Sequence, residues 1–357
     1  MTKYPILNIN AAETNAAKVL IIYTGGTLGM VFDHKIGSLV PFKFEQILND
    51  LPELKRLGLN LSFLALPEPI DSSNVSPEVW TELTNIIENY YNDYQGFVIL
   101  HGTDTMAYTA SALSFMIQNL TKSIVITGAQ LPIGIPRTDA RENLITSIEI
   151  AGFQENGVSK VPEVCIYFNG KLLRGNRSKK HESSQFDAFE SENYPYLGNI
   201  GVLAEFNSTA ILKIKENTSP VFYKKLNASV GILKLFPGIN EASVKHFLSQ
   251  KGLKGVVLET YGAGNAPSTD WFVSLIEEAI KSGKAILNVS QCVGGKVLMG
   301  KYETSRKLAD MGVISGSDMS TEAAITKLMW VLEKTQNHEE IKQLLESNIS
   351  GELSSDN

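Results

Sequence analysis

The sequence predicts a two-domain α/β protein, with a larger N-terminal domain followed by a smaller C-terminal one. Short, nearly continuous apolar runs alternate with longer amphipathic segments, a pattern typical of parallel strands that helices cover on both faces. The 357 residues exceed what one hydrophobic core usually serves. A polar, turn-rich stretch near residues 207–228 interrupts the alternation, and we interpret it as a linker between the domains.

The N-terminal domain, residues 1–206, is expected to contain a mostly parallel sheet flanked by helices. The helix near residue 76 has the clearest start, because Ser76 can cap it, Pro77 suits the first helical position and Glu78 suits the first turn. The predicted strands are 18–24, 61–66, 96–101, 123–128 and 163–168. The predicted helices lie near 43–57, 76–94, 105–119 and 138–153.

The C-terminal domain, residues 229–357, repeats the alternation on a smaller scale and is expected to form a second α/β unit. Its predicted strands are 229–235, 255–260 and 285–290. Its predicted helices are 241–250, 269–282, 320–335 and 338–347.

Composition and charge narrow the class of protein. The net charge of −6 gives no reason to expect nucleic acid, whose binding needs a basic face. No run of 18 apolar residues suggests a membrane span, and the polar start of the chain does not resemble a secretory signal. The two cysteines, Cys165 and Cys292, lie in or beside apolar runs, so a disulfide framework is not expected. These features predict a protein of the reducing cytoplasm.

Two glycine turns carry threonines at the ends of predicted strands. Thr24-Gly25-Gly26-Thr27-Leu28-Gly29 follows the apolar run 19–23, and His101-Gly102-Thr103-Asp104-Thr105 follows the run 97–100. The carboxyl ends of strands in open α/β sheets are where ligands bind. A hydroxyl held there on a tight turn favours nucleophilic chemistry over cofactor chemistry.

Each turn also has a plainer interpretation. The glycines of the first turn match neither GxGxxG nor GxxxxGK[ST], which argues against nucleotide binding. The plainer alternative to a functional turn is a glycine turn with a purely structural role. Such a turn does not require threonine on both sides, so a functional role for Thr24 and Thr27 is favoured. In the second turn, Thr103 or Asp104 could cap the helix that begins near Met106. An Asp104 carboxylate would be stabilised there and could bind a substrate ammonium group.

Two other polar segments are weaker signals. Asp71-Ser72-Ser73 is most simply a turn or a helix cap, and Lys179-Lys180-His181 is most simply solvated surface. A lysine near a threonine could instead carry protons if burial lowers its pKa. The sequence contains no HExxH or CxxC pattern, so we expect no catalytic metal, and it contains no GxSxG pattern, which argues against a Ser-His-Asp triad.

Taken together, the motifs resemble the L-asparaginase family, and in particular its bacterial cytoplasmic type I branch. The resemblance runs from about residue 18 to the C-terminus and is carried most specifically by the TGGT and HGTDT motifs in this order. Further matching segments are Asp71-Ser72-Ser73, Arg174-Gly175-Asn176-Arg177, Tyr261 to Pro267 (YGAGNAP) and Gly351-Glu352-Leu353.

The resemblance implies hydrolysis of L-asparagine to L-aspartate and ammonia without cofactor or metal. It also implies a larger N-terminal and a smaller C-terminal domain, in subunits that form a homodimer or a dimer-of-dimers tetramer. Thr27 matches the nucleophile. Thr103, Asp104 and Lys180 match the second threonine and its acid–base partners. Asp71 and Ser72 match the residues that hold the amino-acid head of the substrate, together with Asp104.

The chemistry of these residue types agrees with that assignment. A threonine hydroxyl is a poor nucleophile unless a base assists it. Lys180, as the neutral amine, could take a proton through Thr103, and Asp104 would be coupled to that titration. Backbone N–H groups of a glycine turn could form an oxyanion hole.

This sequence departs from the family pattern in two places. Many members carry a tyrosine shortly after the nucleophile, whereas the corresponding loop, residues 37–42, has none. Some cytoplasmic members also have a regulatory asparagine site. Its arginine and its threonine fall at Glu259 and Lys179 here, and only its cysteine is kept, as Cys292. We therefore expect the arginine-based regulatory site to be absent.

Three alternatives to an asparaginase remain open. A comparable enzyme acting on L-glutamine would use the same residues. The amidase subunit of a tRNA-dependent amidotransferase usually has an extra N-terminal domain, and only about 17 residues precede the first predicted strand here. A non-catalytic amino-acid sensor on the same fold should lack Thr27, Thr103 or Lys180, and this chain has all three.

Overall fold

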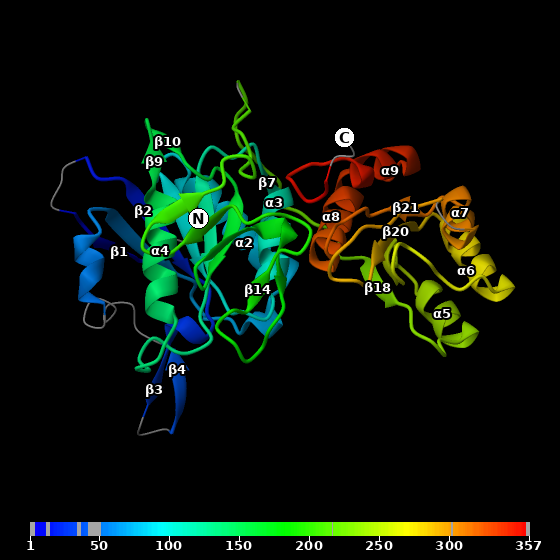
Figure 1. Cartoon of the computed structure of the whole chain (residues 1–357), viewed down its shortest axis with the longest axis horizontal. Helices are drawn as coiled ribbons and strands as arrows, with labels where there is room; N and C mark the ends of the chain where they lie inside the picture. Colours follow the sequence, from blue (N-terminus) through cyan, green and yellow to red (C-terminus); the bar gives the residue numbers. More distant parts are fainter. Residues whose placement is uncertain are drawn as a thin grey trace. The chain divides into compact units, whose positions relative to one another are not determined.

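The computed structural model describes residues 4–11, 15–33, 37–41, 51–215, 217–300 and 303–354. The chain forms two compact units, whose elements are labelled in Figure 1. The first unit consists of Met1–Ser191 and Pro195–Tyr223, and the second of Glu192–Tyr194 and Lys224–Asn357. Glu192–Tyr194, which lies in sequence between the two stretches of the first unit, thus belongs to the second unit.

The first unit is built on a nine-stranded mixed sheet. The five central strands, in the order β5-β2-β6-β8-β11, are parallel, and each lies within one residue of a predicted strand at both ends. The α/β fold class is therefore confirmed. In sheet order the strands are β1 (Ile6–Ile9), β5 (Asn60–Ala65), β2 (Lys18–Tyr23), β6 (Gly96–Leu100), β8 (Ser123–Thr127), β11 (Val164–Phe168), β12 (Lys171–Arg174), β15 (Gly198–Ile200) and β16 (Ala204–Phe206).

The edge strands were not predicted from the sequence. β1 pairs antiparallel with β5, and β12, β15 and β16 extend the other edge as an antiparallel meander. These strands have three or four residues each, and those beyond β12 are partly exposed, so they lack the continuous apolar run of a central strand. Short antiparallel ladders also form β3 (Met30–Asp33) with β4 (Ser38–Pro41), β7 (Ile117–Gln118) with β17 (Val221–Phe222), β9 (Gln154–Glu155) with β10 (Val158–Ser159), and β13 (Lys179–Lys180) with β14 (Phe189–Glu190).

Helices pack on both faces of the central strands. α4 (Ala140–Gly152) packs on β6 and β8. It approaches β6 so closely that a Cβ at Gly96 would fall 1.9 Å from the Ala151 carbonyl oxygen. α3 (Met106–Met116) packs on β8 and β11, and α2 (Pro77–Tyr90) packs on α3. Ser76 precedes α2 as predicted, but its hydroxyl donates to the Glu78 carboxylate rather than accepting from a backbone amide.

One predicted helix of this unit cannot be compared in full. Most of the helix predicted near 43–57 lies outside the described residues, and its last part forms the 3₁₀ helix η3 (Pro52–Arg56).

The order of the central strands reverses within the sheet. From β2 the chain first adds β5 on one side, then returns to add β6 on the other side, and continues through β8 to β11. The direction of winding therefore reverses beside β2. Ligands in open α/β sheets bind at the carboxyl ends of the strands where this reversal occurs. The two threonine-bearing turns follow β2 and β6, so the fold brings both motifs to that place.

The second unit has a four-stranded parallel sheet in the order β18-β19-β20-β21. The side chains of α5 and α6 form a core with Val256, Leu258 and Ile286, whereas Leu328 and Leu332 of α8 pack where Gly255 leaves space on the other face. Its strands are β18 (Val230–Lys234), β19 (Gly255–Thr260), β20 (Ala285–Ser290) and β21 (Ile314–Ser315), and its helices are α5 (Glu241–Leu248), α6 (Asp270–Lys281), α7 (Glu303–Asp310), α8 (Thr321–Lys334) and α9 (His338–Glu346). Of these, β21 and α7 were not predicted.

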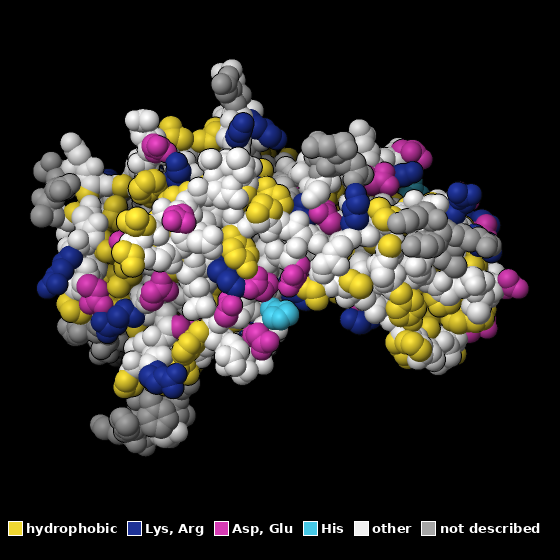
Figure 2. All heavy atoms as spheres, in the orientation of Figure 1, with side chains coloured by type: hydrophobic (Ala, Val, Ile, Leu, Met, Phe, Trp, Pro, Cys, Tyr) yellow, Lys and Arg dark blue, Asp and Glu magenta, His cyan; other side chains and the backbone are white. Residues whose placement is uncertain are grey.

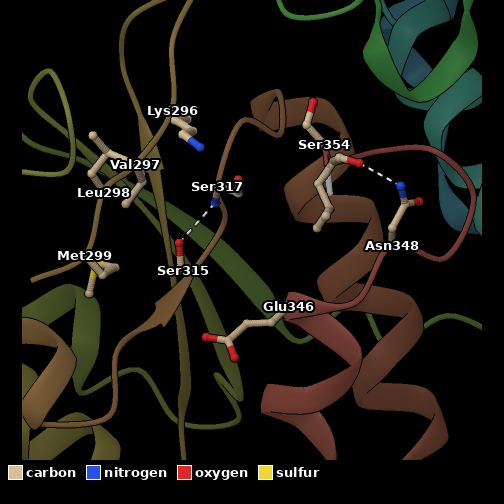
Figure 3. Close-up of a pocket in the computed structure, with 10 residues that line it drawn as sticks. Lys296, Val297, Leu298, Met299, Ser315, Ser317, Glu346, Asn348 and Ser354 are labelled. Atoms are coloured by element: carbon tan, nitrogen blue, oxygen red, sulfur yellow. Dashed lines mark hydrogen bonds between the residues drawn. The ribbon is translucent and has the colours of Figure 1, made fainter. Parts of the chain in front are cut away.

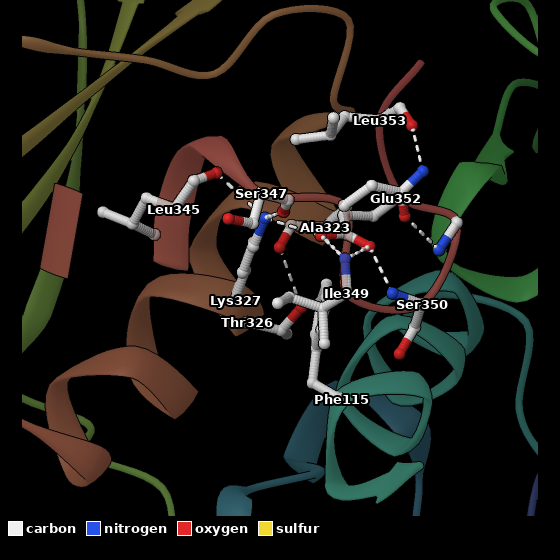
Figure 4. A network of polar contacts seen from close by, with 12 residues as sticks. Phe115, Ala323, Thr326, Lys327, Leu345, Ser347, Ile349, Ser350, Glu352 and Leu353 are labelled. Atoms are coloured by element: carbon white, nitrogen blue, oxygen red, sulfur yellow. Dashed lines mark hydrogen bonds and ion pairs between the residues drawn. The ribbon is translucent and has the colours of Figure 1, made fainter. Parts of the chain in front are cut away.

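A buried ion pair holds the end of the chain in the second unit (Figure 4). Lys327 and Glu352 are both fully buried, and Lys327 Nζ lies 2.5 Å from Glu352 Oε1. The ammonium also donates to the carbonyl of Leu345, at 2.9 Å, and the carboxylate accepts from the backbone amides of Ile349 and Ser350. Since every charge has several partners, the pair is a structural clamp on the segment after α9.

Charged side chains of both signs are interspersed over the face drawn in Figure 2, without a continuous basic surface among the described residues there. Among the described helices, none has the length and apolar character that a membrane crossing requires. Both cysteines are unpaired: Cys165 is buried and Cys292 is exposed.

Candidate active site

The first turn is anchored through Thr24. The Thr24 amide and hydroxyl each lie 3.0 Å from the Leu100 carbonyl oxygen at the end of β6, and the Thr24 carbonyl accepts from the Ile70 amide at 2.7 Å. Thr24 is only 2% exposed. Its hydroxyl is therefore engaged in holding β2, β6 and the loop at Ile70 together. The structure thus assigns Thr24 a part in holding this turn, whereas a chemical role for Thr24 or Thr27 stays a prediction.

Glycines bring the two turns into direct contact. Gly26 has a φ of 89°, which other residues rarely adopt, and a Cβ there would lie 2.5 Å from Gly102 Cα. Thr27 follows Gly26 at the start of the 3₁₀ helix η1 (Thr27–Gly29) and is half-buried. Thr103 follows Gly102 in the opposing turn. The two threonines thus stand on neighbouring turns at the carboxyl edge of the sheet.

The second turn meets a lysine that lies far away in the sequence. Lys180 on β13 places Nζ 2.8 Å from Thr103 Oγ1 and 2.6 Å from Asp104 Oδ1. The lysine side chain is 18% exposed, whereas the Asp104 side chain is 65% exposed. The structure therefore brings together three of the sequence-predicted site residues. It also corrects the capping interpretation, because Thr105, not Thr103 or Asp104, is the N-cap of α3.

Asp71 and Ser72 adjoin the same turn. Thr105 Oγ1 donates to the Ser72 carbonyl at 2.7 Å, and a Cβ at Gly102 would lie 2.5 Å from Ser72 Oγ, so Ser72 packs against the HGTDT turn. The Asp71 carboxylate accepts from the Ser73 amide and hydroxyl, both at 2.9 Å, which lowers its pKa. Asp71 caps the 3₁₀ helix η4 (Ser72–Asn74), as its simpler interpretation predicted, and it remains exposed and ionised.

A buried chain of hydrogen bonds supports the second turn from behind. Trp80 Nε1 donates to Thr109 Oγ1 at 2.9 Å, and that hydroxyl lies 2.9 Å from His101 Nε2. His101 Nδ1 lies 2.7 Å from the Gly102 carbonyl oxygen, so this nitrogen carries the proton. Burial lowers the pKa of His101 to about 4. The imidazole is therefore neutral near pH 7, and its role here is to hold the peptide that precedes Thr103.

The two-stranded ribbon that carries Lys180 is fixed by groups that the sequence analysis missed. Lys171 Nζ binds the carboxylates of Asp187, at 2.8 Å, and Glu190 of β14, and Tyr196 donates to Glu190 at 2.5 Å. Partial burial lowers the pKa of Lys171, but the hydrogen bonds to the Asp187 and Glu190 carboxylates raise it by more, so the net shift is upward. These polar residues, three of them charged, are scattered over 26 positions of chain from Lys171 to Tyr196, so no local pattern marks them.

Gln130 is a further residue that the sequence analysis missed. It lies just beyond β8, and its side chain reaches Thr103 of the second turn. Its position after the third central strand, within the segment Gly128-Ala129-Gln130, is the one signal that could have drawn attention to it.

Glu259, where the sequence analysis expects no arginine-based regulatory site, has partners within the second unit. The Glu259 carboxylate, at the carboxyl end of β19, accepts from Thr321 Oγ1 at 2.5 Å and lies 3.3 Å from Lys234 Nζ. Glu259 is thus a strand-end carboxylate that pairs with a nearby lysine. The absence of an arginine-based regulatory site remains a prediction.

The second unit also contains a cavity of about 710 Å³ (Figure 3). It opens beside Ser315 and Ser317 at the end of β21, with Lys296 and Glu346 at its margins and apolar side chains such as Met299 in its wall. None of the predicted site residues lines it. Among the described residues, no cluster of three or more His, Cys, Asp or Glu side chains is arranged to hold a metal ion.

Comparison with known proteins identifies the class to which this fold and site belong. The family model for the asparaginase N-terminal domain matches residues 18–212, and the model for the glutaminase/asparaginase C-terminal domain matches residues 229–345. The chain therefore belongs to the asparaginase family, as the sequence motifs indicated.

Individual relatives cover nearly the whole chain. L-asparaginase 1 of Escherichia coli (strain K12) is 38% identical over 339 residues, which are 95% of this chain and 98% of that protein. L-asparaginase I of Vibrio cholerae superposes with a TM-score of 0.86 at 36% identity, covering 95% of this chain and all of the other. The thermostable L-asparaginase of Thermococcus kodakarensis gives a TM-score of 0.87 at 32% identity, with the same coverage.

Proposed function

We propose that this protein is an L-asparaginase that hydrolyses L-asparagine to L-aspartate and ammonia through a covalent acyl-threonine intermediate on Thr27. The observation that carries the proposal is the contact of Lys180 Nζ with Thr103 Oγ1 and Asp104 Oδ1, on a turn that packs against the turn of Thr27. The relatives named L-asparaginase, at 38% and 36% identity over nearly the whole chain, support the choice of substrate.

In the first half of the reaction, Thr27 Oγ attacks the side-chain amide carbon of asparagine. The C–O bond of a β-aspartyl ester forms, and the C–N bond breaks. The hydroxyl proton of Thr27 leaves with the amine, which departs as ammonia. Backbone N–H groups of the glycine turn would stabilise the oxyanion of the tetrahedral intermediate. Because this chain lacks the family's tyrosine in residues 37–42, another group must assist the loss of the Thr27 proton.

In the second half, water attacks the ester carbon and releases aspartate. Thr103 takes a proton from the water and passes its own to Lys180, which must then be the neutral amine. The proton returns to Thr27 Oγ as the ester bond breaks, so the cycle is balanced. Asp104 Oδ1 lies 2.6 Å from Lys180 Nζ and is therefore placed to hold the ammonium that forms in this step.

The same corner of the first unit offers groups for the amino-acid head of the substrate. The carboxylates of Asp71 and Asp104 are exposed and suit an α-ammonium group. Ser72 and neighbouring backbone amides suit the α-carboxylate. The proposed chemistry needs no metal or cofactor. We further propose a cytoplasmic homodimer or dimer of dimers, in keeping with two unpaired cysteines, and light scattering of the purified protein tests the assembly.

The test is to measure ammonia release from asparagine and to trap the intermediate. With hydroxylamine present, the acyl-enzyme should partition to aspartyl hydroxamate in proportion to hydroxylamine concentration. Rapid acid quench followed by peptide mass spectrometry should find the aspartyl mass on the peptide that contains Thr27. Absence of ammonia release would overturn the proposed substrate, and hydroxamate without label on Thr27 would overturn the proposed nucleophile.

A further inference from the structure

Gln130 bridges the two segments that carry the proposed proton relay. Its Oε1 lies 3.4 Å from Thr103 Oγ1, and its Nε2 donates to the Gln185 carbonyl at 2.9 Å. Gln185 belongs to the loop between β13, which carries Lys180, and β14. One side-chain amide thus connects the HGTDT turn with the Lys180 ribbon.

The backbone at Gln130 is held firmly, so the amide has a defined starting point. The Asp139 carboxylate accepts from the Gln130 amide, at 2.9 and 3.1 Å, and from the Leu131 amide at 3.0 Å. Asn143 Nδ2 also donates to that carboxylate, at 3.2 Å. Gln130 itself is half-buried. A side chain that starts from such a backbone clamp loses little conformational freedom when it makes its two further contacts.

The orientation of the amide follows from its partners. A backbone carbonyl can only accept, so the group that faces Gln185 must be the NH₂ donor. The carbonyl oxygen of Gln130 therefore faces Thr103 and can only accept the hydroxyl proton of that residue. The 3.4 Å separation is long for a hydroxyl-to-carbonyl bond, and such contacts in substrate-free sites often tighten only when substrate binds.

This arrangement sets two acceptors in competition for one proton. When Thr103 donates to Gln130, its oxygen is free to accept from a protonated Lys180. When Lys180 is neutral, its lone pair needs the same Thr103 proton that Gln130 accepts. The Gln130 carbonyl therefore favours the state in which Lys180 carries the extra proton, and it opposes the state in which Lys180 is a base.

We propose that Gln130 is a positioning residue that orients the Thr103 hydroxyl and thereby sets the pH at which the Thr103–Lys180 relay becomes active. The inference rests on the proposed asparaginase function. The charged groups at this corner or next to Lys180 in the chain are Asp71, Asp104, Asp139, Lys179, His181 and Glu182, and those that hold the ribbon are Lys171, Asp187 and Glu190. A substitution at Gln130 leaves all of these charged side chains in the protein, so a shift of the pH midpoint reports on position 130.

The test compares two substitutions of similar size. Gln130→Met removes the acceptor, so the protonated relay loses support and the acidic midpoint of the pH profile of kcat/KM for asparagine should move to lower pH. Gln130→Glu adds an anion beside Thr103 and Lys180, which favours the protonated relay, and the midpoint should move to higher pH by about 1 unit. Below the midpoint, a shift of about 1 unit is a tenfold loss of kcat/KM.

A control removes the same kind of bond elsewhere. Gln118, in β7, also donates through Nε2 to a backbone carbonyl, that of Phe115, at 3.0 Å. Gln118→Met should leave the midpoint unchanged. Circular dichroism establishes that each variant is folded, and if the Met variant does not fold, the direction of the shift in the Glu variant decides alone.

The outcomes separate this inference from the proposed function. Opposite shifts in the two variants support the role of Gln130. An active wild-type enzyme whose midpoint is unmoved in the Glu variant, or moves in the same direction in both variants, overturns that role and leaves the proposed function standing. A wild-type protein that releases no ammonia from asparagine overturns the proposed function and the role of Gln130 with it.

Discussion

Each unit has a cluster of lysine, carboxylate and threonine at the carboxyl end of its parallel strands, but the two clusters are built in opposite ways. In the first unit, Lys180 is the centre, with 18% of its side chain exposed, and it contacts Thr103 and an Asp104 side chain that is 65% exposed. In the second unit, Glu259 is the centre, with 10% of its side chain exposed, and the paired lysine, Lys234, is 65% exposed.

The two clusters differ in what the central side chain can do with a proton. A lysine that loses its proton becomes a base with a lone pair, and Thr103 beside it can deliver a proton from the site. The Glu259 carboxylate instead accepts from Thr321 and lies 3.3 Å from the exposed ammonium of Lys234, so its contacts are those of an ion pair. The same three side-chain types therefore make a candidate relay in one unit and a structural ion pair in the other.

The largest effect is expected at Thr27, the proposed nucleophile, whose turn contacts the turn of the first cluster. Thr27→Ala removes the oxygen that forms the ester and should lower kcat by several orders of magnitude, with little change in thermal unfolding. Thr27→Ser keeps a hydroxyl and is the matched control. Initial rates of ammonia release measure the effect. A Thr27→Ala enzyme that kept a tenth of wild-type activity would contradict the assignment.

The centre of each cluster is the next test. Lys180→Met should lower kcat by about 10²- to 10⁴-fold, because the relay loses its base, and Thr103→Ala should be comparably damaging. Lys234→Met removes the lysine of the second cluster and should leave kcat within about twofold, since exposed ion pairs contribute little. If Lys234→Met were as damaging as Lys180→Met, the contrast drawn between the clusters would be wrong.

A third lysine–carboxylate pair shows what complete burial does. Lys327→Met would leave Glu352 charged and without its cation, and the carbonyls of Leu345 and Ser347 would lose their donor. We expect a loss of about 3–5 kcal/mol in the free energy of unfolding. Urea unfolding followed by circular dichroism measures it, and Glu352→Gln in the same background should recover part of the loss. An unchanged midpoint would mean that the pair does not clamp the segment after α9.

How much the sequence could predict depended on burial. The central strands were recognisable because both faces are covered, which makes them continuous apolar runs, as in Val98-Ile99-Leu100. The edge strand β16, with the sequence Ala-Glu-Phe, has only three residues, two of them exposed, and its charged Glu205 separates the two apolar ones, so the strand itself contains no continuous apolar run. α7, with the sequence ETSRKLAD, has polar residues around most of its circumference, so no apolar stripe indicated a helix.

The candidate site divides in a similar way. Thr27, Thr103 and Asp104 could be found because each follows a buried strand on a glycine turn, and Lys180 because of the family resemblance. Gln130 and Lys171 act through contacts across 27 and 19 residues of chain, to Thr103 and Glu190, so local sequence says nothing about them. The structural use of Thr24 was also hidden, because it depends on the Leu100 carbonyl of another strand.

The preference between asparagine and glutamine is a further test of how the first cluster holds its substrate. Asp71, Ser72 and Asp104 would fix the head of the substrate, so the extra methylene of glutamine should displace its amide carbon from Thr27. One methylene is worth roughly 1–3 kcal/mol, and we expect kcat/KM for asparagine to exceed that for glutamine about 10- to 200-fold. Ammonia release from both substrates, measured side by side, gives the ratio. A ratio below about threefold would count against a fixed head group.

The smallest effect is expected at the centre of the second cluster. An arginine at the position of Glu259 could bind the α-carboxylate of an effector with two parallel hydrogen bonds, but a glutamate offers only acceptors and repels that group. Lys179 would supply a cation from a different direction and without the planar fork. Cooperativity requires an effector that binds two conformations unequally, and Glu259 would not provide the arginine fork for such an effector. The rate should therefore depend hyperbolically on asparagine concentration, and Glu259→Gln should leave that dependence unchanged. Sigmoidal kinetics in the wild type, reduced by Glu259→Gln, would show instead that an effector site has been rebuilt around other residues.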